Sequence, residues 1–263
     1  MKCLYRKILR KLGLHRKFKT EKVGKYIVTY DPSTVIGGHL FVGEQFEKDE
    51  LKLANKYINS GSTILDIGAN IGLHTLHYSA VAKNGLVIAC EPQPETFKTL
   101  LRNIYQNDVK NVTPLNIAIS DTAKIADFYI MSDDAYSSLI DTARKALSEK
   151  IRVLCTTIDG LLGEIKVDFV KIDVEGMELS VLHSMCKLIQ RSHPVIFCEI
   201  YKGNVESYDP HDTISYLENM GYLVNRIIDG VMIEFCSNNQ HDDRYFNYIF
   251  LPKEEKSSAF VDT

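Results

Sequence analysis

The chain has 263 residues, of which 45% are hydrophobic, and a formal net charge of −3. This length and composition suit one large α/β domain with a short appendage, and no apolar run reaches the ~18 residues of a membrane-spanning helix. Six scattered cysteines without metal-ligand spacing argue against a disulfide framework or a zinc site and favour a reduced, cytoplasmic protein.

Residues 1–22 form a basic N-terminal arm, with nine Lys or Arg side chains against one Glu, a local charge of +8. The remainder therefore carries −3 − 8 = −11, which argues against a nucleic-acid substrate. Leu4, Ile8 and Leu12 recur at roughly helical spacing among the cations, as in a helix on an anionic membrane surface. The arm is either such a peripheral membrane contact or a solvated tail.

Residues 23–60 are expected to form an N-terminal extension. Short strands are predicted at residues 26–30 and 39–42, around a turn at Gly37-Gly38, followed by a helix over residues 49–58.

From residue 61 to 252 the pattern predicts the main domain. Strands are expected at residues 63–67, 86–90, 112–117, 167–172 and 195–200, with helices near residues 71–82, 94–107, 176–190 and 211–220. This alternation predicts βαβ units and a doubly wound, mostly parallel sheet.

Less regular segments are expected in the second half of the chain. Residues 132–150 are predicted to be a loop followed by a helix. Residues 222–228 and 248–251 are predicted to be a pair of edge strands joined by a loop-like stretch, and residues 253–263 a disordered tail.

The first strand of the main domain ends in a glycine loop, which reads Leu65-Asp66-Ile67-Gly68-Ala69-Asn70-Ile71-Gly72. Gly68 permits a tight turn, and Gly72 lets the next helix begin close to the strand. The G-x-x-x-G spacing lacks the third glycine of a dinucleotide loop. An acid at the strand end, Asp66, suits S-adenosylmethionine, which carries a sulfonium and an ammonium, better than it suits a diphosphate.

Two further strand ends are expected beside this loop. Glu91 follows Asp66 by 25 residues, where a carboxylate can accept both ribose hydroxyls of a nucleoside. The third strand leads into Asn116-Ile117-Ala118-Ile119-Ser120-Asp121. Its apolar residues would flank an adenine and Ser120 or Asp121 would bond the adenine amine, with a plain turn as the alternative.

Three carboxylates follow the fourth strand, in Asp173-Val174-Glu175-Gly176-Met177-Glu178. Such crowding is unfavourable unless the groups are solvated, paired or bound to a cation. We expect Asp173 and Glu175 to face the cleft, and Glu178 to lie in the first turn of the next helix, where the helix dipole stabilises a negative charge.

The histidines do not predict a metal site. His74 and His77 lie three residues apart on the first helix, but the pattern offers no third ligand. His74 remains a candidate for lining the pocket, and His183 is expected to be structural.

Together these residues resemble the FkbM-type methyltransferases, over roughly residues 45–202. The marks of the resemblance are the Asp66 loop, Glu91-Pro92-Gln93-Pro94 with Phe97, Leu100 and Asn103, Asn116 to Ser120, Thr157-Ile158-Asp159, Val170 to Glu178 and the later Glu199. In two places the sequence departs from the family pattern: Leu73-His74 replaces the usual aromatic character after the loop, and nothing beyond about residue 230 matches.

The resemblance implies a Rossmann-like class I methyltransferase that uses S-adenosylmethionine. The cofactor-binding residues expected at the loop and the two following strand ends are Asp66, Gly68, Ala69, Asn70, Gly72, Glu91, Pro92 and Ala118. The expected reaction is O-methylation of a sugar, glycan or secondary-metabolite hydroxyl. Asp173 or Glu175 would act as general base, with residues 26–42 and 132–150 closing over the acceptor.

Three alternatives stay open from the sequence. A nicotinamide-dependent oxidoreductase is disfavoured by the missing third glycine. A nucleic-acid amino-methyltransferase is disfavoured because Asp173-Val174-Glu175-Gly176 stands where an aromatic, proline-containing tetrapeptide is expected. A non-catalytic binding module is disfavoured only by the intact Asp66, Glu91 and carboxylate cluster.

Overall fold

The computed structural model describes residues 18–43, 47–142, 145–202 and 208–253. Most of the expected basic arm, up to residue 17, and the expected tail from residue 254 therefore lie outside the described residues. Among the described residues, no helix has both the length and the apolar character needed to cross a membrane.

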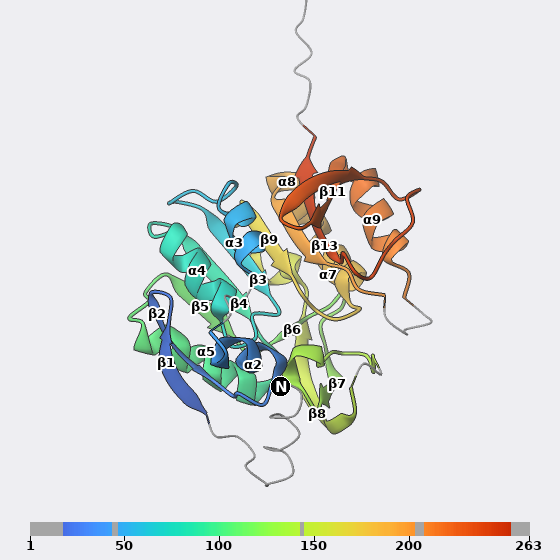
Figure 1. Cartoon of the computed structure of the whole chain (residues 1–263). Coiled ribbons are helices and arrows are strands. Elements are labelled where there is room, and N and C mark those ends of the chain that lie inside the picture. Colours follow the sequence, from blue (N-terminus) through green and yellow to red (C-terminus); the bar gives the residue numbers. More distant parts are fainter. Residues whose placement is uncertain (1–17, 44–46, 143–144, 203–207, 254–263) are drawn as a thin grey trace, which may run out of the picture.

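A central sheet of eight strands organises the described residues (Figure 1). Its order is β12-β11-β13-β10-β9-β3-β4-β5. The strands are β3 (Thr63–Ile67), β4 (Leu86–Cys90), β5 (Val112–Leu115), β9 (Phe169–Ile172), β10 (Val195–Glu199), β11 (Tyr222–Ile228), β12 (Val231–Phe235) and β13 (Asn247–Pro252). The five strands from β5 to β10 in this order pair in parallel, and β13 is antiparallel to both of its neighbours. The predicted α/β class and doubly wound, mostly parallel sheet are confirmed.

The order of the strands reverses between β3 and β9. The chain runs outward from β3 through β4 to β5, then returns to β9 on the other side of β3 and continues to β10. The loops that follow β3 and β9 therefore lie side by side, and the backbone N–H of Asp173 donates to the Ile67 carbonyl at 3.0 Å. In open α/β sheets this reversal is where ligands bind.

Helices cover both faces of the sheet, each over its own apolar core. One face carries α3 (Lys48–Ala54), α4 (Leu73–Val81) and α5 (Pro94–Gln106). The other carries α6 (Ile158–Leu162), α7 (Glu178–Ser184), α8 (Cys186–Ser192) and α9 (Pro210–Asn219). Neighbouring strand residues such as Ile64 and Leu65 point to opposite cores and are both fully buried, as expected for strands covered on two faces.

The N-terminal extension differs from the prediction. β2 (Tyr26–Tyr30) is a strand as expected, but it pairs with β1 (Lys19–Val23), and residues 39–42 belong to the helix α2 (Val35–Phe41) and the turn after it. Thr34 caps this helix by accepting from the Gly37 N–H. Gly37 is not a turn residue: a Cβ there would lie 1.8 Å from the Asp31 carbonyl oxygen. The hairpin contacts α5 through β2, and α2 packs on Ile71 and on Leu76 of α4.

A three-stranded sheet, in the order β6-β8-β7, stands apart from the central sheet. It consists of β6 (Ala118–Ile119), β7 (Lys124–Met131) and β8 (Leu147–Thr156), with the short 3-10 helix η1 (Asp134–Tyr136) after β7. The helix predicted near residue 150 is therefore wrong. Val153 and Cys155 alternate with exposed residues and pack on Phe128, the period-two pattern of a strand with one buried face.

The late strands also differ from the prediction. β11 and β13 pair as expected, but the supposed loop between them contains β12, which forms the edge of the sheet. Asp229 and Gly230 both have positive φ and join β11 to β12 by a two-residue turn. An Asp-Gly pair between apolar runs is a hairpin signal that the sequence reading missed.

Candidate active site

The backbone of the loop after β3 lies close against the backbone of the loop after β9. Gly68 has φ +82°, and a Cβ at this position would lie 1.8 Å from the Asp173 carbonyl oxygen. Only glycine tolerates both conditions. The N–H groups of Gly68 and Ala69 both donate to the Cys90 carbonyl at 3.0 Å, so the loop is fastened to the end of β4.

Asp66 lies beneath this loop and is fully buried. The Thr75 hydroxyl on α4 donates to its Oδ2 at 2.5 Å, which ties the strand end to the following helix. Its Oδ1 is buried and has no hydrogen-bond partner among the described residues. Asp66 therefore contributes from behind the loop and does not face open space.

Glu91 directly follows β4, and its carboxylate binds the loop after β3. The Asn70 N–H donates to its Oε2 at 3.0 Å, and the Gln93 N–H donates to its Oε1 at 2.8 Å. The side chain of Asn116 donates to the Glu91 carbonyl at 2.8 Å. These bonds fix the carboxylate beside the end of β4.

A cleft with an empty volume of about 600 Å³, counted out to open solvent, runs along these strand ends. Its lining includes seven of the ten residues predicted for the cofactor and for catalysis, namely Gly68, Asn70, Glu91, Pro92, Ala118, Asp173 and Glu175. The other three, Asp66, Ala69 and Gly72, do not line it; Gly72 is the N-cap of α4.

The third strand end is only partly as expected. Ile117, Ala118 and Ile119 line the cleft, but Ser120 and Asp121 do not. Ser120 donates to the Asp121 carboxylate at 3.1 Å, and the Asp121 N–H donates to Ser180. The described residues thus present an apolar wall here, with its neighbouring polar groups satisfied locally.

The loop after β9 contains a buried ion pair. Lys171 is on β9, its side chain is 3% exposed, and its ammonium donates to Asp173 Oδ2 at 2.7 Å. Burial opposes the charge, but Asp173, Glu47 and other nearby carboxylates raise the pKa of Lys171 above its ordinary value. Lys171 therefore remains a cation and holds Asp173 in place.

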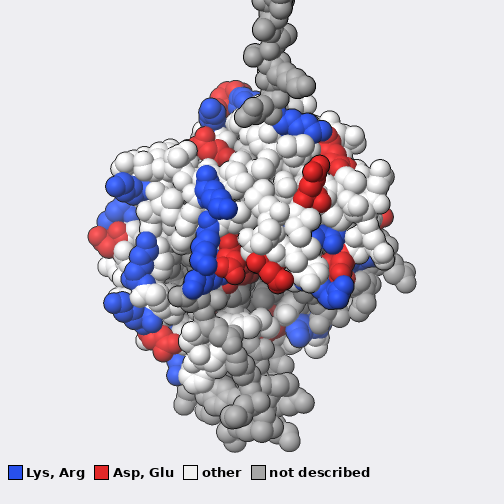
Figure 2. All heavy atoms as spheres, turned by 45° about the horizontal axis from the view of Figure 1, so that its top comes forward, with Lys and Arg blue, Asp and Glu red and all other residues white. Residues whose placement is uncertain are grey.

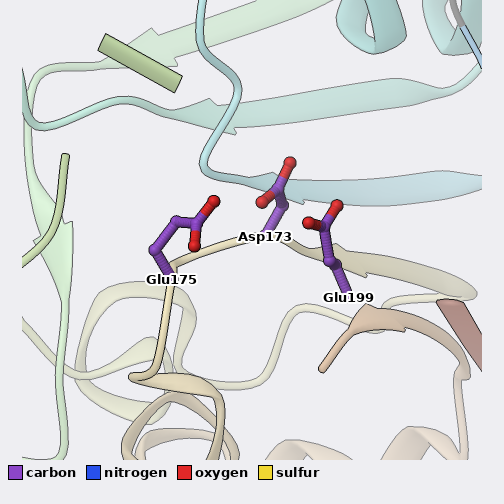
Figure 3. Close-up of side chains that lie close together, drawn as sticks. All are labelled: Asp173, Glu175 and Glu199. Atoms are coloured by element: carbon purple, nitrogen blue, oxygen red, sulfur yellow. The ribbon is translucent and has the colours of Figure 1, made fainter. Parts of the chain in front are cut away.

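Asp173, Glu175 and Glu199 form a carboxylate triad at the ends of β9 and β10 (Figure 3). One oxygen from each side chain lies within 4.8 Å of the others, a spacing that a divalent cation could bridge. Burial, followed by the charges of Asp173 and Glu175, raises the pKa of Glu199 well above its ordinary value. The triad can therefore hold a proton, which is the requirement for acid–base chemistry.

Glu178 lies in the first turn of the following helix, as expected. It is the first residue of α7 and is buried, and its Oε1 accepts from the Gly176 N–H at 2.8 Å. Burial raises its pKa to about 7. Through its bond to the Gly176 N–H, Glu178 therefore holds the loop that carries Asp173 and Glu175.

Two segments outside the central sheet reach the site. In the insertion, Ser137, Ser138 and Leu139 line the cleft, and the Ser138 hydroxyl donates to the carbonyls of Val174 and Glu175. From the extension, Ile36 lines a smaller hollow on the other side of the Gly68 loop.

That smaller hollow is also lined by His74, Lys171 and Asp173. His74 Nε2 lies 3.0 Å from Glu47 Oε2, so the predicted pocket histidine is next to the carboxylate triad and not in the main cleft. His77 bonds to Asn55, and His183 makes an edge-to-face contact with Tyr216. Among the described residues, no histidine belongs to the group that could hold a metal ion.

The fold and the cleft together define an α/β domain with a cleft at the reversal of strand order. The model of the family described as methyltransferase FkbM domain matches residues 66–224. The chain therefore belongs to this methyltransferase family, as its sequence motifs predicted.

The individual relatives are also named as methyltransferases. Over 174 residues the chain is 30% identical to the hexuronic acid methyltransferase AglP of Haloferax volcanii, covering 65% of this chain and 67% of that protein. It is 27% identical to methyltransferase sdnD of Sordaria araneosa, covering 64% of this chain and 76% of that one. A crystal structure of methyltransferase FkbM from Methylobacillus flagellatus superposes with a TM-score of 0.50 at 16% identity, covering 74% of this chain but 44% of that chain, which supports the fold.

Proposed function

We propose that the protein is an S-adenosylmethionine-dependent methyltransferase that methylates a hydroxyl group of a sugar, glycan or secondary metabolite. The observation that carries this proposal is the cleft at the strand reversal, which is lined by the Gly68 loop and Glu91, after β3 and β4, and by Asp173 and Glu175, after β9. Membership of a methyltransferase family supports the reaction class.

The residues of the loop suit S-adenosylmethionine, which when bound supplies the electrophilic methyl group. Glu91 is placed to accept the ribose hydroxyls, and Pro92 and Ala118 offer apolar contacts to a base. The buried, unpartnered Oδ1 of Asp66 calls for a donor such as a bridging water or an amine. Gly68 lets the loop lie against the Asp173 carbonyl, where a side chain would clash.

The acceptor side of the cleft offers groups that can remove a proton. Methyl transfer needs the acceptor oxygen in line with the methyl group, and the hydroxyl proton must leave that oxygen. Asp173 is held by Lys171 and faces the cleft, so we assign it or Glu175 as the general base. Glu199, which the sequence marked only as a secondary candidate, then receives or shares that proton within the triad.

The acceptor class rests on the shape of the site and on one relative. The insertion places Ser137 on the cleft wall. Its hydroxyl accepts from the Met131 N–H and can donate to a polyhydroxylated acceptor. The relative from Haloferax volcanii is by its printed name a methyltransferase of a hexuronic acid, which supports a sugar.

We place the enzyme in the cytoplasm, with the basic arm as a contact to anionic membranes. The five described cysteines are all free thiols, three of them buried, which supports a reducing compartment. The cations of the arm support attraction to an anionic surface.

The proposal is tested by incubating the purified full chain with labelled S-adenosylmethionine and glycan, lipid-linked sugar or metabolite extracts. We expect label in an O-methylated product that mass spectrometry identifies. Calorimetric titration with S-adenosylmethionine and with NAD separates the reaction classes: binding of NAD alone would replace the proposal with an oxidoreductase. Cofactor binding without transfer to any extract would favour a binding module.

A further inference from the structure

A second hollow lies outside the proposed active site, between the β1–β2 hairpin, α2, α3 and α4. Its empty volume is about 910 Å³, counted out to open solvent. Five apolar or aromatic side chains form its floor, namely Val23, Tyr26, Leu40, Leu51 and Leu73. We call this hollow the hairpin groove. Nothing in the proposed reaction uses it.

The rim of the hairpin groove is cationic. Lys25, Lys48 and Lys52 line it and are exposed, and no Asp or Glu is among its described lining residues. Lys52 is paired with Asp49 at 2.9 Å, and the Lys25 ammonium lies 5.1 Å from the centre of the Tyr26 ring. On the face shown in Figure 2, Lys and Arg side chains lie next to Asp and Glu side chains.

The polar groups of the groove wall also indicate which kind of ligand the hairpin groove could bind. Burial lowers the pKa of His77 to about 4, so this side chain is neutral and bonds to Asn55 at 2.7 Å. The Tyr26 hydroxyl is buried and has no hydrogen-bond partner among the described residues. Its donor can be satisfied by a water or by an oxygen of a ligand bound beside Lys25.

We propose that the hairpin groove binds a single-chain anionic amphiphile, with its hydrocarbon chain on the apolar floor and a phosphate headgroup at Lys25 and Lys48. A wholly polar ligand would leave the floor exposed to water, and a neutral or cationic chain would gain nothing from the lysines. The basic arm of this chain does not suit the groove, because seven of its nine Lys and Arg lie within residues 1–17 and would be repelled by the rim.

The groove adjoins the reaction centre through one residue. Leu73 lines both the hairpin groove and the smaller hollow that contains His74 and Asp173. A chain bound in the groove therefore lies directly beside the first turn of α4. The proposal goes beyond methyl transfer and does not depend on it.

The test uses calorimetry on the full chain with dodecyl phosphate as the probe. Dodecyl maltoside carries the same chain with a neutral head, dodecyltrimethylammonium carries a cationic head, and inorganic phosphate has no chain. We expect dodecyl phosphate to bind at least tenfold more tightly than the other two amphiphiles, and inorganic phosphate not to bind. Decyl phosphate should bind roughly tenfold more weakly than dodecyl phosphate, because each buried methylene strengthens binding about fourfold.

Variants locate the site. Leu51→Ser should weaken dodecyl phosphate binding at least tenfold, because it replaces an apolar side chain of the floor. The double variant Lys25→Glu with Lys48→Glu should also weaken it at least tenfold, because it reverses two charges of the rim. The control Lys187→Glu reverses an exposed charge on α8 and should bind as the wild type does. Melting curves and S-adenosylhomocysteine binding show that each variant is folded and that its cofactor cleft is intact.

Three results would overturn the proposal. They are equal binding of all three amphiphiles, unchanged binding by both groove variants, or no binding of dodecyl phosphate. Deletion of residues 1–17 should leave dodecyl phosphate binding unchanged, and tighter binding after the deletion would show instead that the arm occupies the groove. Failure of any of these tests leaves S-adenosylmethionine binding as a separate question, which the titrations above answer.

Discussion

The two ends of the main cleft are built differently. At the cofactor end, which follows β3 and β4, Glu91 and the buried Asp66 behind the loop accept bonds from the hydroxyl or backbone N–H groups of nearby segments, and the glycine loop is fastened to β4. At the acceptor end, Asp173, Glu175 and Glu199 crowd together around a buried lysine. The hydrogen bonds of the cofactor end fix the conformation of the glycine loop. The carboxylates of the acceptor end concentrate negative charge and can hold a proton. Substitutions at the two ends should therefore have separable effects.

The largest effect is expected at the acceptor end. Asp173→Asn and Glu175→Gln should bind the cofactor within about threefold of the wild type, while at least one loses on the order of 10²–10⁴-fold in turnover, because the general base is gone. Steady-state rates with a soluble acceptor, together with calorimetry, check this. If both variants turn over normally and a chelator has no effect, the triad is structural. Loss of activity in chelator with recovery in magnesium would assign the triad to a cation.

The second prediction concerns the buried carboxyl of Glu178 and the dependence of folding stability on pH. Its pKa of about 7 lies above the ordinary 4.5, so the folded state holds the proton that the unfolded state releases. Folding stability should therefore fall as pH rises from about 4.5 to about 7, by on the order of 3 kcal/mol. Glu178→Gln keeps the acceptor for Gly176 and cannot titrate, so it should remove this slope in denaturant melts. An unchanged slope would show that other groups cause it.

Glu91→Ala probes the cofactor end. It should weaken S-adenosylmethionine binding by about 1.5–3 kcal/mol, the range for hydrogen bonds to a charged group. The control Glu95→Ala removes an exposed carboxylate on α5 that pairs with Lys98, and it should bind normally. Because Glu91 also holds the Asn70 N–H, melting curves must accompany the titration. Unchanged affinity in Glu91→Ala would contradict the ribose assignment.

The sequence predicts the cofactor end of the cleft better than the acceptor end. The Gly68 loop and Glu91 could be predicted because glycine conformation and strand spacing are local properties. The approach of Glu199 to Asp173 and the burial of Glu178 depend on how β9, β10 and the segments over them pack, which no local pattern records. The helix at Val35–Phe41 was mistaken for a turn and a strand because Gly37 is needed for a close contact, not for a turn.

The smallest effect on catalysis is expected from the basic arm. Deleting residues 1–17 should leave turnover of a soluble acceptor within about twofold, because β1 begins only at Lys19. A deletion to residue 22 would also remove most of β1 and confuse the result. Binding to anionic vesicles should fall, since each cation near such a surface contributes about 1 kcal/mol. Equal sedimentation of both forms with vesicles would leave the arm as a solvated tail.

The most direct test of the divided cleft is calorimetric titration of the wild type, Asp173→Asn and Glu91→Ala with S-adenosylhomocysteine. We predict that the wild type and Asp173→Asn bind within about threefold of each other, and that Glu91→Ala binds at least tenfold more weakly, as a loss of about 1.5–3 kcal/mol requires. No binding to the wild type would contradict the assignment of the cleft as a cofactor site. Normal binding by Glu91→Ala together with lost binding by Asp173→Asn would contradict the assignment of its two ends.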